Sequence, residues 1–275
     1  MKVKIYIIIN LILLLLKNTN HTYAQEKYSA GARMAGLSGC GTVIIDLWSS
    51  TYNQACLAYI DNISFGYYFE NRFLEESMQL QALALTIPIW NSVVGINMLY
   101  FGNKNFFELK TGLAVAKIIY KNISSALQIN LHTVHQPYYY DDVSTFSFEF
   151  GIFYNSKTFS TGIHLFNITN SVYEQLYNTK LPFITKIGIG IMPFKKIFFT
   201  SELEINNQQK PIIRGGFEYS IIDKIIARIG ISTYQYSGYS FGLGFIQKRL
   251  KANIAFSQHI YLGFTPHLDF TYSFK

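Results

Sequence analysis

From Asn62 to the C-terminus, large apolar residues alternate with small or polar residues at a period of two. In the stretch 146–152, FSFEFGI, every second residue is large and apolar, and the residues between them are Ser, Glu and Gly. The stretches 186–191 (KIGIGI), 239–245 (YSFGLGF) and 267–274 (HLDFTYSF) follow the same rule. Because successive side chains of a strand point to opposite faces of its sheet, this pattern predicts strands with one apolar face and one small or polar face.

The composition of the second face separates a membrane barrel from a soluble β-sandwich. In a sandwich the polar face meets water, and repeated glycine fits that face poorly. In a transmembrane barrel the apolar face meets lipid, and the face towards the lumen can be small or polar. Charged residues make up 14% of the chain, where about 25% is usual, and aromatic residues make up 17%. The sequence therefore predicts an all-β fold, a transmembrane antiparallel β-barrel.

Turn residues divide the chain after Asn62 into about fourteen alternating segments. An even number of strands is the rule for bacterial single-chain barrels. The longest gaps between segments, 136–143 and 170–180, are the expected protruding loops. The predicted segments are 62–73, 77–88, 91–102, 106–119, 122–134, 144–155, 157–168, 181–193, 195–206, 210–221, 223–234, 237–247, 249–260 and 264–274.

Residues 1–24, MKVKIYIIINLILLLLKNTNHTYA, have the three parts of a secretory signal peptide. A basic start precedes an apolar core over residues 5–16, and Thr22-Tyr23-Ala24 forms a small-residue cleavage site. A retained transmembrane helix is the alternative, but its apolar run has 12 residues where about 20 are needed. We therefore expect a mature chain made of an N-terminal segment, residues 25–61, and a barrel, residues 62–275.

The stretch 31–62, GARMAGLSGCGTVIIDLWSSTYNQACLAYIDN, is rich in Gly, Ala and Ser. It resembles the N-terminal segment of the FadL superfamily and of its PorV/PorQ branch from Bacteroidota, which reads G-A-R-x-x-G-M-G-G-A, then an acidic residue and N-P-A-G-L-A. Gln54 and Cys56 depart from this pattern, and N-Q-A-x-L-A is similar to a subgroup of short Bacteroidota barrels. The matching residues are Gly31, Ala32, Arg33, Gly36, Gly39, Asp46, Trp48, Asn53, Ala55, Leu57 and Ala58.

The resemblance implies that residues 25–61 fold inside the barrel as a small plug, or hatch. A physical argument points the same way, because a fourteen-stranded barrel has an interior wider than side chains alone can fill. A segment rich in Gly, Ala and Ser can pack closely against strands whose inner face carries Gly. A disordered linker is the alternative, and the apolar residues 43–45, Leu47 and Trp48 argue against it.

The resemblance also implies two functions of different classes, neither of them enzymatic. The first is an outer-membrane barrel whose plugged lumen binds or passes small hydrophobic compounds. The second is a PorV/PorQ-like accessory barrel of type IX protein secretion, which handles secreted proteins and transports nothing itself. Both place the chain in the bacterial outer membrane, in contact with lipid and without a cofactor. The formal net charge of +7, which loses three positive charges with the signal peptide, is too mild to indicate nucleic acid as a partner.

Alternation places five charged residues on the inward face of three successive strands. They are Glu202 and Glu204, then Arg214 and Glu218, then Arg228. An unpartnered buried charge is costly, so we expect opposite charges on neighbouring strands to meet inside the lumen. A structural network is the expected role, and a role in ligand selectivity is the alternative.

Cys40 and Cys56 are the two cysteines of the chain. In an exported protein they could pair and close a short loop, and the alternative is two small buried side chains. The stretch Leu37-Ser38-Gly39-Cys40 looks like a lipoprotein cleavage box, but it lies too far from the apolar core of the signal peptide to act as one.

The histidines raise two possibilities of chemistry. His132 and His135, with Asp141-Asp142 nearby, could hold a metal. The aromatic loop that follows them favours a membrane-interface belt with a polar tip instead. A serine nucleophile beside His164 or His267 is conceivable, but no spacing selects such a set. The sequence therefore predicts no catalytic, metal or cofactor site.

Overall fold

The computed structural model describes residues 28–136, 142–173, 179–207, 210–233 and 238–274. The predicted signal peptide and residues 25–27 of the N-terminal segment lie outside the described residues. Within the described ranges, no helix has the length and apolar character needed to span a membrane.

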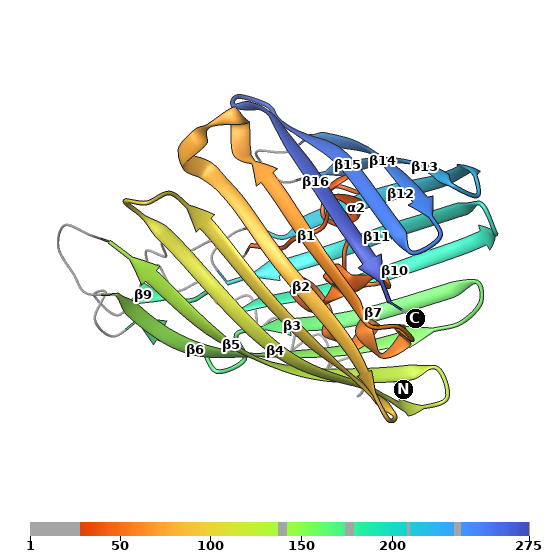
Figure 1. Cartoon of the computed structure of the whole chain (residues 1–275), viewed down its shortest axis with the longest axis horizontal. Helices are drawn as coiled ribbons and strands as arrows, with labels where there is room; N and C mark the ends of the chain where they lie inside the picture. The colour runs from red at the N-terminus through yellow and green to blue at the C-terminus, as the bar shows by residue number, and fades with distance from the viewer. Residues whose placement is uncertain (1–27, 137–141, 174–178, 208–209, 234–237, 275) are drawn as a thin grey trace, which may run out of the picture.

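Fourteen antiparallel strands close into a barrel, in which β1 pairs with both β2 and β16 (Figure 1). The predicted fourteen strands are thus confirmed, with bounds that differ from the prediction by at most three residues. The strands are β1 (Ser64–Asn71), β2 (Gln79–Ile89), β3 (Ser92–Gly102), β4 (Phe107–Tyr120), β5 (Ile123–His135), β6 (Val143–Asn155), β7 (Phe159–Phe166), β10 (Ile184–Phe194), β11 (Ile197–Asn206), β12 (Ile212–Ile222), β13 (Ile225–Ser232), β14 (Tyr239–Gln247), β15 (Leu250–His259) and β16 (Gly263–Ser273).

The connection between β7 and β10 contains a separate two-stranded ladder, β8 (Val172–Tyr173) and β9 (Thr179–Lys180). The sequence predicted only a loop here, because two-residue strands are too short to show alternation. Tyr173 and Leu181 pack with Val134 and Val143 at the ends of β5 and β6. This connection is therefore held against the barrel by its own small apolar cluster.

The two ends of the barrel differ in their connections. At one end, which we call the turn end, every connection between strands has two or three residues. These tight turns are 90–91, 121–122, 156–158, 195–196, 223–224 and 248–249. At the other end, the loop end, the connections range from three residues (260–262) to seventeen (167–183). The last strand, β16, ends at the turn end.

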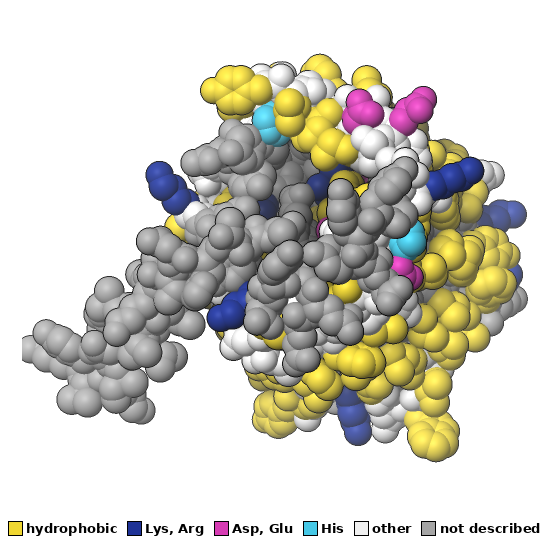
Figure 2. Space-filling view, turned by 90° about the vertical axis from the view of Figure 1, so that its left-hand side faces the viewer, with side chains coloured by type: hydrophobic (Ala, Val, Ile, Leu, Met, Phe, Trp, Pro, Cys, Tyr) yellow, Lys and Arg dark blue, Asp and Glu magenta, His cyan; other side chains and the backbone are white. Residues whose placement is uncertain are grey.

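The predicted alternation is present in the wall. On β6, the outward side chains of Phe146 and Phe148 are 59% and 40% exposed, whereas those of Ser147 and Glu149 are fully buried. Isoleucine, leucine, phenylalanine and tyrosine recur at the outward positions of the other strands. Figure 2, which looks towards the loop end, shows hydrophobic side chains on the parts of the wall at the top, right and bottom of the view. An apolar outer band is what contact with lipid acyl chains requires.

The described residues of the N-terminal segment, 28–61, lie inside the barrel (Figure 1). They form a short helix, α2 (Ala32–Ala35), and two 3-10 helices, η1 (Leu47–Thr51) and η2 (Gln54–Tyr59). Helix α2 contacts β14, β15 and β16, η1 contacts β1, β2 and β3, and η2 contacts β3 to β6. The residues between α2 and η1 contact the remaining strands, so the segment touches the inner wall all the way round.

Inward-facing glycines make room for this segment. A β-carbon on Gly162 would lie 2.8 Å from the carbonyl oxygen of Thr42, and one on Gly188 would lie 2.8 Å from the Thr42 β-carbon. Distances this short do not occur for real side chains, so only glycine fits there. Most of the inward-facing glycines are thereby explained, whereas Gly112, Gly190 and Gly244 make room for side chains of the wall itself. Other glycines that meet the segment are Gly66, Gly95, Gly151, Gly216, Gly230 and Gly242.

Candidate functional site

The contact between residues 28–61 and the inner wall is the candidate functional site, because buried charged side chains gather along it. Glu202 of β11 is one centre of this contact. Its Oε2 accepts hydrogen bonds from the backbone nitrogens of Gly41 and Thr42, both at 2.9 Å, and from Thr42 Oγ1 at 2.6 Å. A carboxylate that receives three hydrogen bonds from one stretch of chain fixes that stretch to the wall.

Two cations balance the charge of Glu202 and its neighbour Glu204. Arg214 lies 3.2 Å from Glu202 and 2.9 Å from Glu204, and Lys186 lies 3.7 Å and 3.1 Å from the same carboxylates. Three of these four residues were expected to meet in the lumen. Lys186 was recognised only as part of an alternating strand, not as a partner of these acids.

Arg33 of the N-terminal segment and Glu218 of β12 form the second centre. The guanidinium of Arg33 donates two hydrogen bonds to the carboxylate of Glu218, both at 2.9 Å. Arg228 Nε donates to the same carboxylate at 2.6 Å. Burial alone would lower the pKa of Arg33, but the carboxylates of Glu218 and Asp46 outweigh it and raise this pKa. Arg33 therefore stays charged and joins the N-terminal segment to Glu218 of β12, a carboxylate that Arg228 of β13 also binds.

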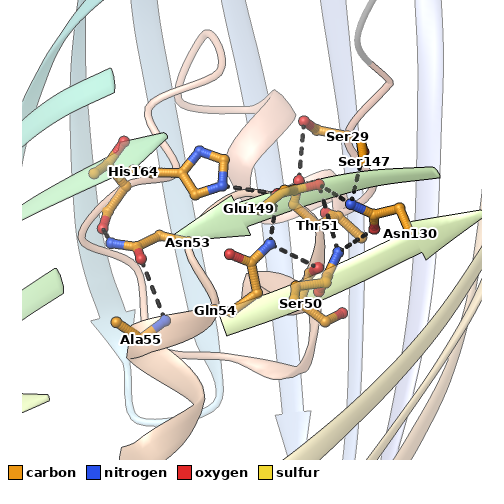
Figure 3. A network of polar contacts seen from close by, with 12 residues as sticks. Ser29, Ser50, Thr51, Asn53, Gln54, Ala55, Asn130, Ser147, Glu149 and His164 are labelled. Atoms are coloured by element: carbon orange, nitrogen blue, oxygen red, sulfur yellow. Dashed lines mark hydrogen bonds and ion pairs between the residues drawn. The ribbon is translucent and has the colours of Figure 1, made fainter. Parts of the chain in front are cut away.

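A third centre surrounds Glu149 of β6, which is fully buried (Figure 3). Its carboxylate accepts hydrogen bonds from Gln54 at 2.8 Å, from His164 at 2.8 Å and from Lys110 at 2.5 Å. Asn130 adds another at 3.0 Å. Gln54 stands where the FadL-like pattern has proline, so this departure from the pattern supplies a bond between the segment and the wall.

Sequence reasoning missed the Glu149 network, although a signal for it was present. Lys110, Asn130, Glu149 and His164 all occupy inward positions of neighbouring strands by the same alternation that selected Glu202. The N-terminal segment is thus held by buried polar groups on both sides of the barrel.

Asp46 and Asn53 shape the segment itself. Asp46 caps η1 by accepting a hydrogen bond from Trp48 N at 3.0 Å, and it also accepts one from the Tyr52 hydroxyl. Asn53 caps η2 by accepting one from Ala55 N at 3.2 Å. The side-chain nitrogen of Asn53 lies 2.7 Å from Thr42 O but 3.5 Å from the strand backbone at Ile152. Its stronger bonds are therefore internal to the segment.

The small and apolar motif residues are packing residues. Trp48 is 2% exposed, and it lies against Gly31, where a β-carbon would come 3.0 Å from the Trp48 β-carbon. Gly31 has φ 124°, a value that side-chain-bearing residues rarely adopt. Gly36 faces Gly242 of β14, Gly39 lies against Arg214, Ala55 against Gly151 and Leu57 against Gly95.

Both cysteines are free and buried. Cys40 belongs to the apolar cluster around Trp48, and Cys56 belongs to a second cluster that includes Leu57 and Phe153. Burial raises the pKa of both thiols. The structure therefore shows two small buried side chains and not the alternative, a disulfide between Cys40 and Cys56.

The histidines that raised other possibilities have ordinary partners. His132 faces the lumen and lies 2.8 Å from Ser147 Oγ, whereas His135 lies 2.5 Å from Asp142 at the loop end. Asp141 lies outside the described residues. Among the described residues, no group of His, Cys, Asp and Glu is arranged to hold a metal ion. His267 contacts Ser257 at 2.9 Å.

A cavity of about 160 Å³ lies at the turn end, between the N-terminal segment and the wall. Arg33 and residues 43–45 line its inner side. The turn between β6 and β7 and residues of β7, β10 and β11 line its outer side, namely Phe159, Ser160, Gly190, Met192 and Phe198. A cavity of about 150 Å³ can hold a benzene molecule, so the volume of this space suffices for one aromatic ring. Polar side chains, among them Arg33 and Lys157, line it together with the apolar ones.

No protein-family model and no curated protein matches the sequence. Solved structures do match. The chain has a FadL-type barrel fold. A FadL homologue from Pseudomonas aeruginosa superposes with a TM-score of 0.64 at 10% identity, covering 90% of this chain and 99% of the other.

Two further solved barrels with this fold are described as a hydrocarbon transporter and a hydrocarbon channel. The Ralstonia pickettii toluene transporter TbuX superposes with a TM-score of 0.67 at 9% identity, over 91% of this chain and 100% of the other. The CymD monoaromatic hydrocarbon channel gives 0.70 at 11% identity, over 91% and 99%. At such identities the likeness concerns the fold.

Proposed function

We propose that this chain is an outer-membrane barrel that binds or passes small hydrophobic compounds, and that residues 25–61 plug its lumen. The observation that carries this proposal is the cavity at the turn end, which lies between the segment and the wall and has the size of one aromatic ring. The FadL-type fold, shared with barrels named as hydrocarbon transporters and channels, agrees with it.

The plug role rests on how completely the segment fills the barrel. It contacts the inner face of every strand, and Glu149, Glu202 and Glu218 each bind it through hydrogen bonds from its own residues. Releasing it would leave these buried carboxylates with fewer partners, which is costly. The segment therefore closes the lumen in its resting position, and only a local shift is needed to open a passage for a small molecule.

The cavity marks the place where such a shift is easiest. Residues 43–45 lie between the anchor at Thr42 and the cap at Asp46, and their apolar side chains line the cavity. A hydrophobic compound that enters from the loop end would leave past these residues or through the adjacent wall. Polar anchors on either side would hold the rest of the segment in place.

Binding of toluene to the purified barrel, measured by isothermal titration calorimetry in a mild detergent, tests the proposal. Ile45→Trp should fill the cavity and weaken binding by about tenfold or more, because the ring then has no room. Ile60→Trp is the matched control, since Ile60 is a half-buried isoleucine of the same segment away from the cavity. Equal binding by wild type and Ile45→Trp would refute the cavity as the binding place.

The second function, a PorV/PorQ-like accessory barrel of type IX secretion, rests on the resemblance of the N-terminal motif alone. Native mass spectrometry of protein purified from the outer membrane separates it from the first. A retained hydrocarbon or fatty acid at near-stoichiometric occupancy supports the ligand-binding barrel. An empty barrel with a bound secreted protein, together with no toluene binding, would favour the accessory role.

A further inference from the structure

We infer that the turn end carries a binding surface for the headgroups of anionic phospholipids. Exposed lysine and arginine side chains lie on its tight turns or within four residues of them, and we call them the basic ring. Its members are Lys117, Lys121, Lys157, Lys195, Lys196, Lys224, Lys248, Arg249 and Lys251. Among the described residues, the exposed acidic side chains at this end are Asp61 and Asp223.

The cations are spread around the circumference. Five of the six tight turns carry at least one of them, and these turns join successive strands from β4 to β15. The loop end is different, because its exposed lysines and exposed acids are equal in number in the described part of the chain. The lysines are Lys104, Lys180 and Lys210, and the acids are Glu75, Glu76 and Asp142. The charge of the barrel is therefore asymmetric along its axis.

The basic ring lies directly beside the apolar outer band. Trp90 of the β2–β3 turn is fully exposed, and Tyr120 and Phe194, each followed by a lysine of the ring, are 61% and 69% exposed. The Nζ atom of Lys121 lies 5.1 Å from the centre of the Tyr120 ring. Aromatic side chains favour the membrane–water interface, so the cations beside them lie at the level of lipid phosphates.

The arrangement fits a membrane surface better than a protein partner. A folded partner would contact one side of the turn end, and its charges would select a patch of cations there. A planar layer of headgroups surrounds the barrel and meets all the turns at once, which matches a ring. Short turns face the periplasm in bacterial barrels, so the lipid is that of the periplasmic leaflet. Basic residues beside an anionic membrane attract it in proportion to their number.

Competition between two phospholipids tests this inference. The full-length protein in a mild detergent is mixed with equal amounts of phosphatidylglycerol and phosphatidylcholine, and native mass spectrometry counts the retained molecules of each. We expect wild type to retain phosphatidylglycerol about threefold or more in excess. The triple variant Lys195→Gln, Lys196→Gln and Lys224→Gln should lose about half of this excess or more.

The matched control removes the same number of exposed lysines from the loop end, with Lys104→Gln, Lys180→Gln and Lys210→Gln. It should keep the preference of wild type. An equal loss in both triple variants, or no preference in wild type, would overturn the inference. Neither variant touches the cavity or the N-terminal segment, so toluene binding should persist in both, which separates this test from that of the proposed function.

Trp90 offers a second readout that locates the lipid. The chain has two tryptophans, and Trp48 is buried inside the barrel, so quenching by brominated lipid reports on Trp90. Lys117 lies opposite Ser92 in the β3–β4 ladder, near Trp90. In bilayers, brominated phosphatidylglycerol should quench Trp90 more than brominated phosphatidylcholine, and Lys117→Gln with Lys121→Gln should remove the difference. Equal quenching by both lipids in wild type would contradict the inference.

Discussion

The wall and the N-terminal segment are stabilised in different ways. The wall is a continuous antiparallel ladder whose outward side chains are apolar, so each strand depends mainly on its two neighbours. The segment has only short helical turns, and its position depends on a few buried carboxylates of the wall, Glu149, Glu202, Glu218 and Asp269. A single substitution at such a carboxylate should therefore release the segment and leave the barrel intact.

Glu202→Ala should have the largest effect. It removes three hydrogen bonds to residues 41–42 and leaves Lys186 and Arg214 with Glu204 as their remaining acid. Breaking a buried ion pair costs about 3–5 kcal/mol, and we expect this cost to destabilise the docked segment. Limited proteolysis should then cut within residues 28–61, whereas heat-modifiable migration on a gel should show a folded barrel.

Glu76→Ala is the control, because Glu76 is exposed at the loop end. It should leave the protease pattern unchanged. Loss of the folded barrel in Glu202→Ala would contradict the separation of wall and segment, because it would mean that the wall needs the segment to close.

The inward glycines test the contact between the wall and the segment through packing, where Glu202 tests it through charge. Gly188→Val places a β-carbon within 2.8 Å of Thr42, and such overpacking costs about 1–3 kcal/mol. The segment should shift and the proteolysis rate should rise, by less than in Glu202→Ala. Gly215→Val is the matched control, because the nearest atom to its β-carbon is 3.6 Å away, on Ile231. Similar proteolysis of both valine variants would refute the close-packing argument.

Asn53 tests the internal order of the segment. Asn53→Ala removes the cap of η2 and the bond to Thr42 O, and loss of a cap costs about 1 kcal/mol. Asn53→Ser keeps an uncharged oxygen that can cap Ala55 N but has no amide donor for Thr42 O, so the difference between the two variants isolates the cap. We expect the leak of small solutes through liposome-reconstituted protein to rise modestly in Asn53→Ala and less in Asn53→Ser. An unchanged leak in both would count against a plug role for the segment.

The wall could be predicted from the sequence because its information is local. A period of two residues, interrupted by turn residues, located all fourteen barrel strands and the faces of Glu202 and Arg214, which lie directly opposite each other in the ladder. Glu218 and Arg228 are likewise directly opposite. Alternation and strand order place the members of each pair on the inward face of neighbouring strands. They do not fix the register, because a bulge between Ser220 and Ile222 shifts the pairing of Glu218 with Arg228 by one residue.

The partner role of Lys186 shows where local information ends. Counting back from the turn 195–196 would pair Lys186 with Ile205, but a bulge between Ile191 and Phe194 shifts the register by one, so that Lys186 faces Glu204. A bulge changes pairing without a clear trace in the pattern. The contacts of the N-terminal segment are harder still, because residues such as Gln54 and Glu149 are 95 positions apart and no period relates them.

The smallest effect is expected from the two cysteines, which report on the segment without altering it. Cys40 and Cys56 are buried, and burial raises the pKa of both thiols, so the reactive thiolate is scarce in the folded protein. Treatment of wild type with a maleimide at pH 8 should give almost no labelling, whereas denatured protein should label at both sites. The Glu202→Ala variant should label in its folded barrel, because release of the segment exposes both thiols and returns their pKa towards the ordinary range. Labelling of folded wild type as fast as denatured protein would mean that the segment leaves the lumen readily, and the contrast between a firm wall and a firmly docked segment would then fail.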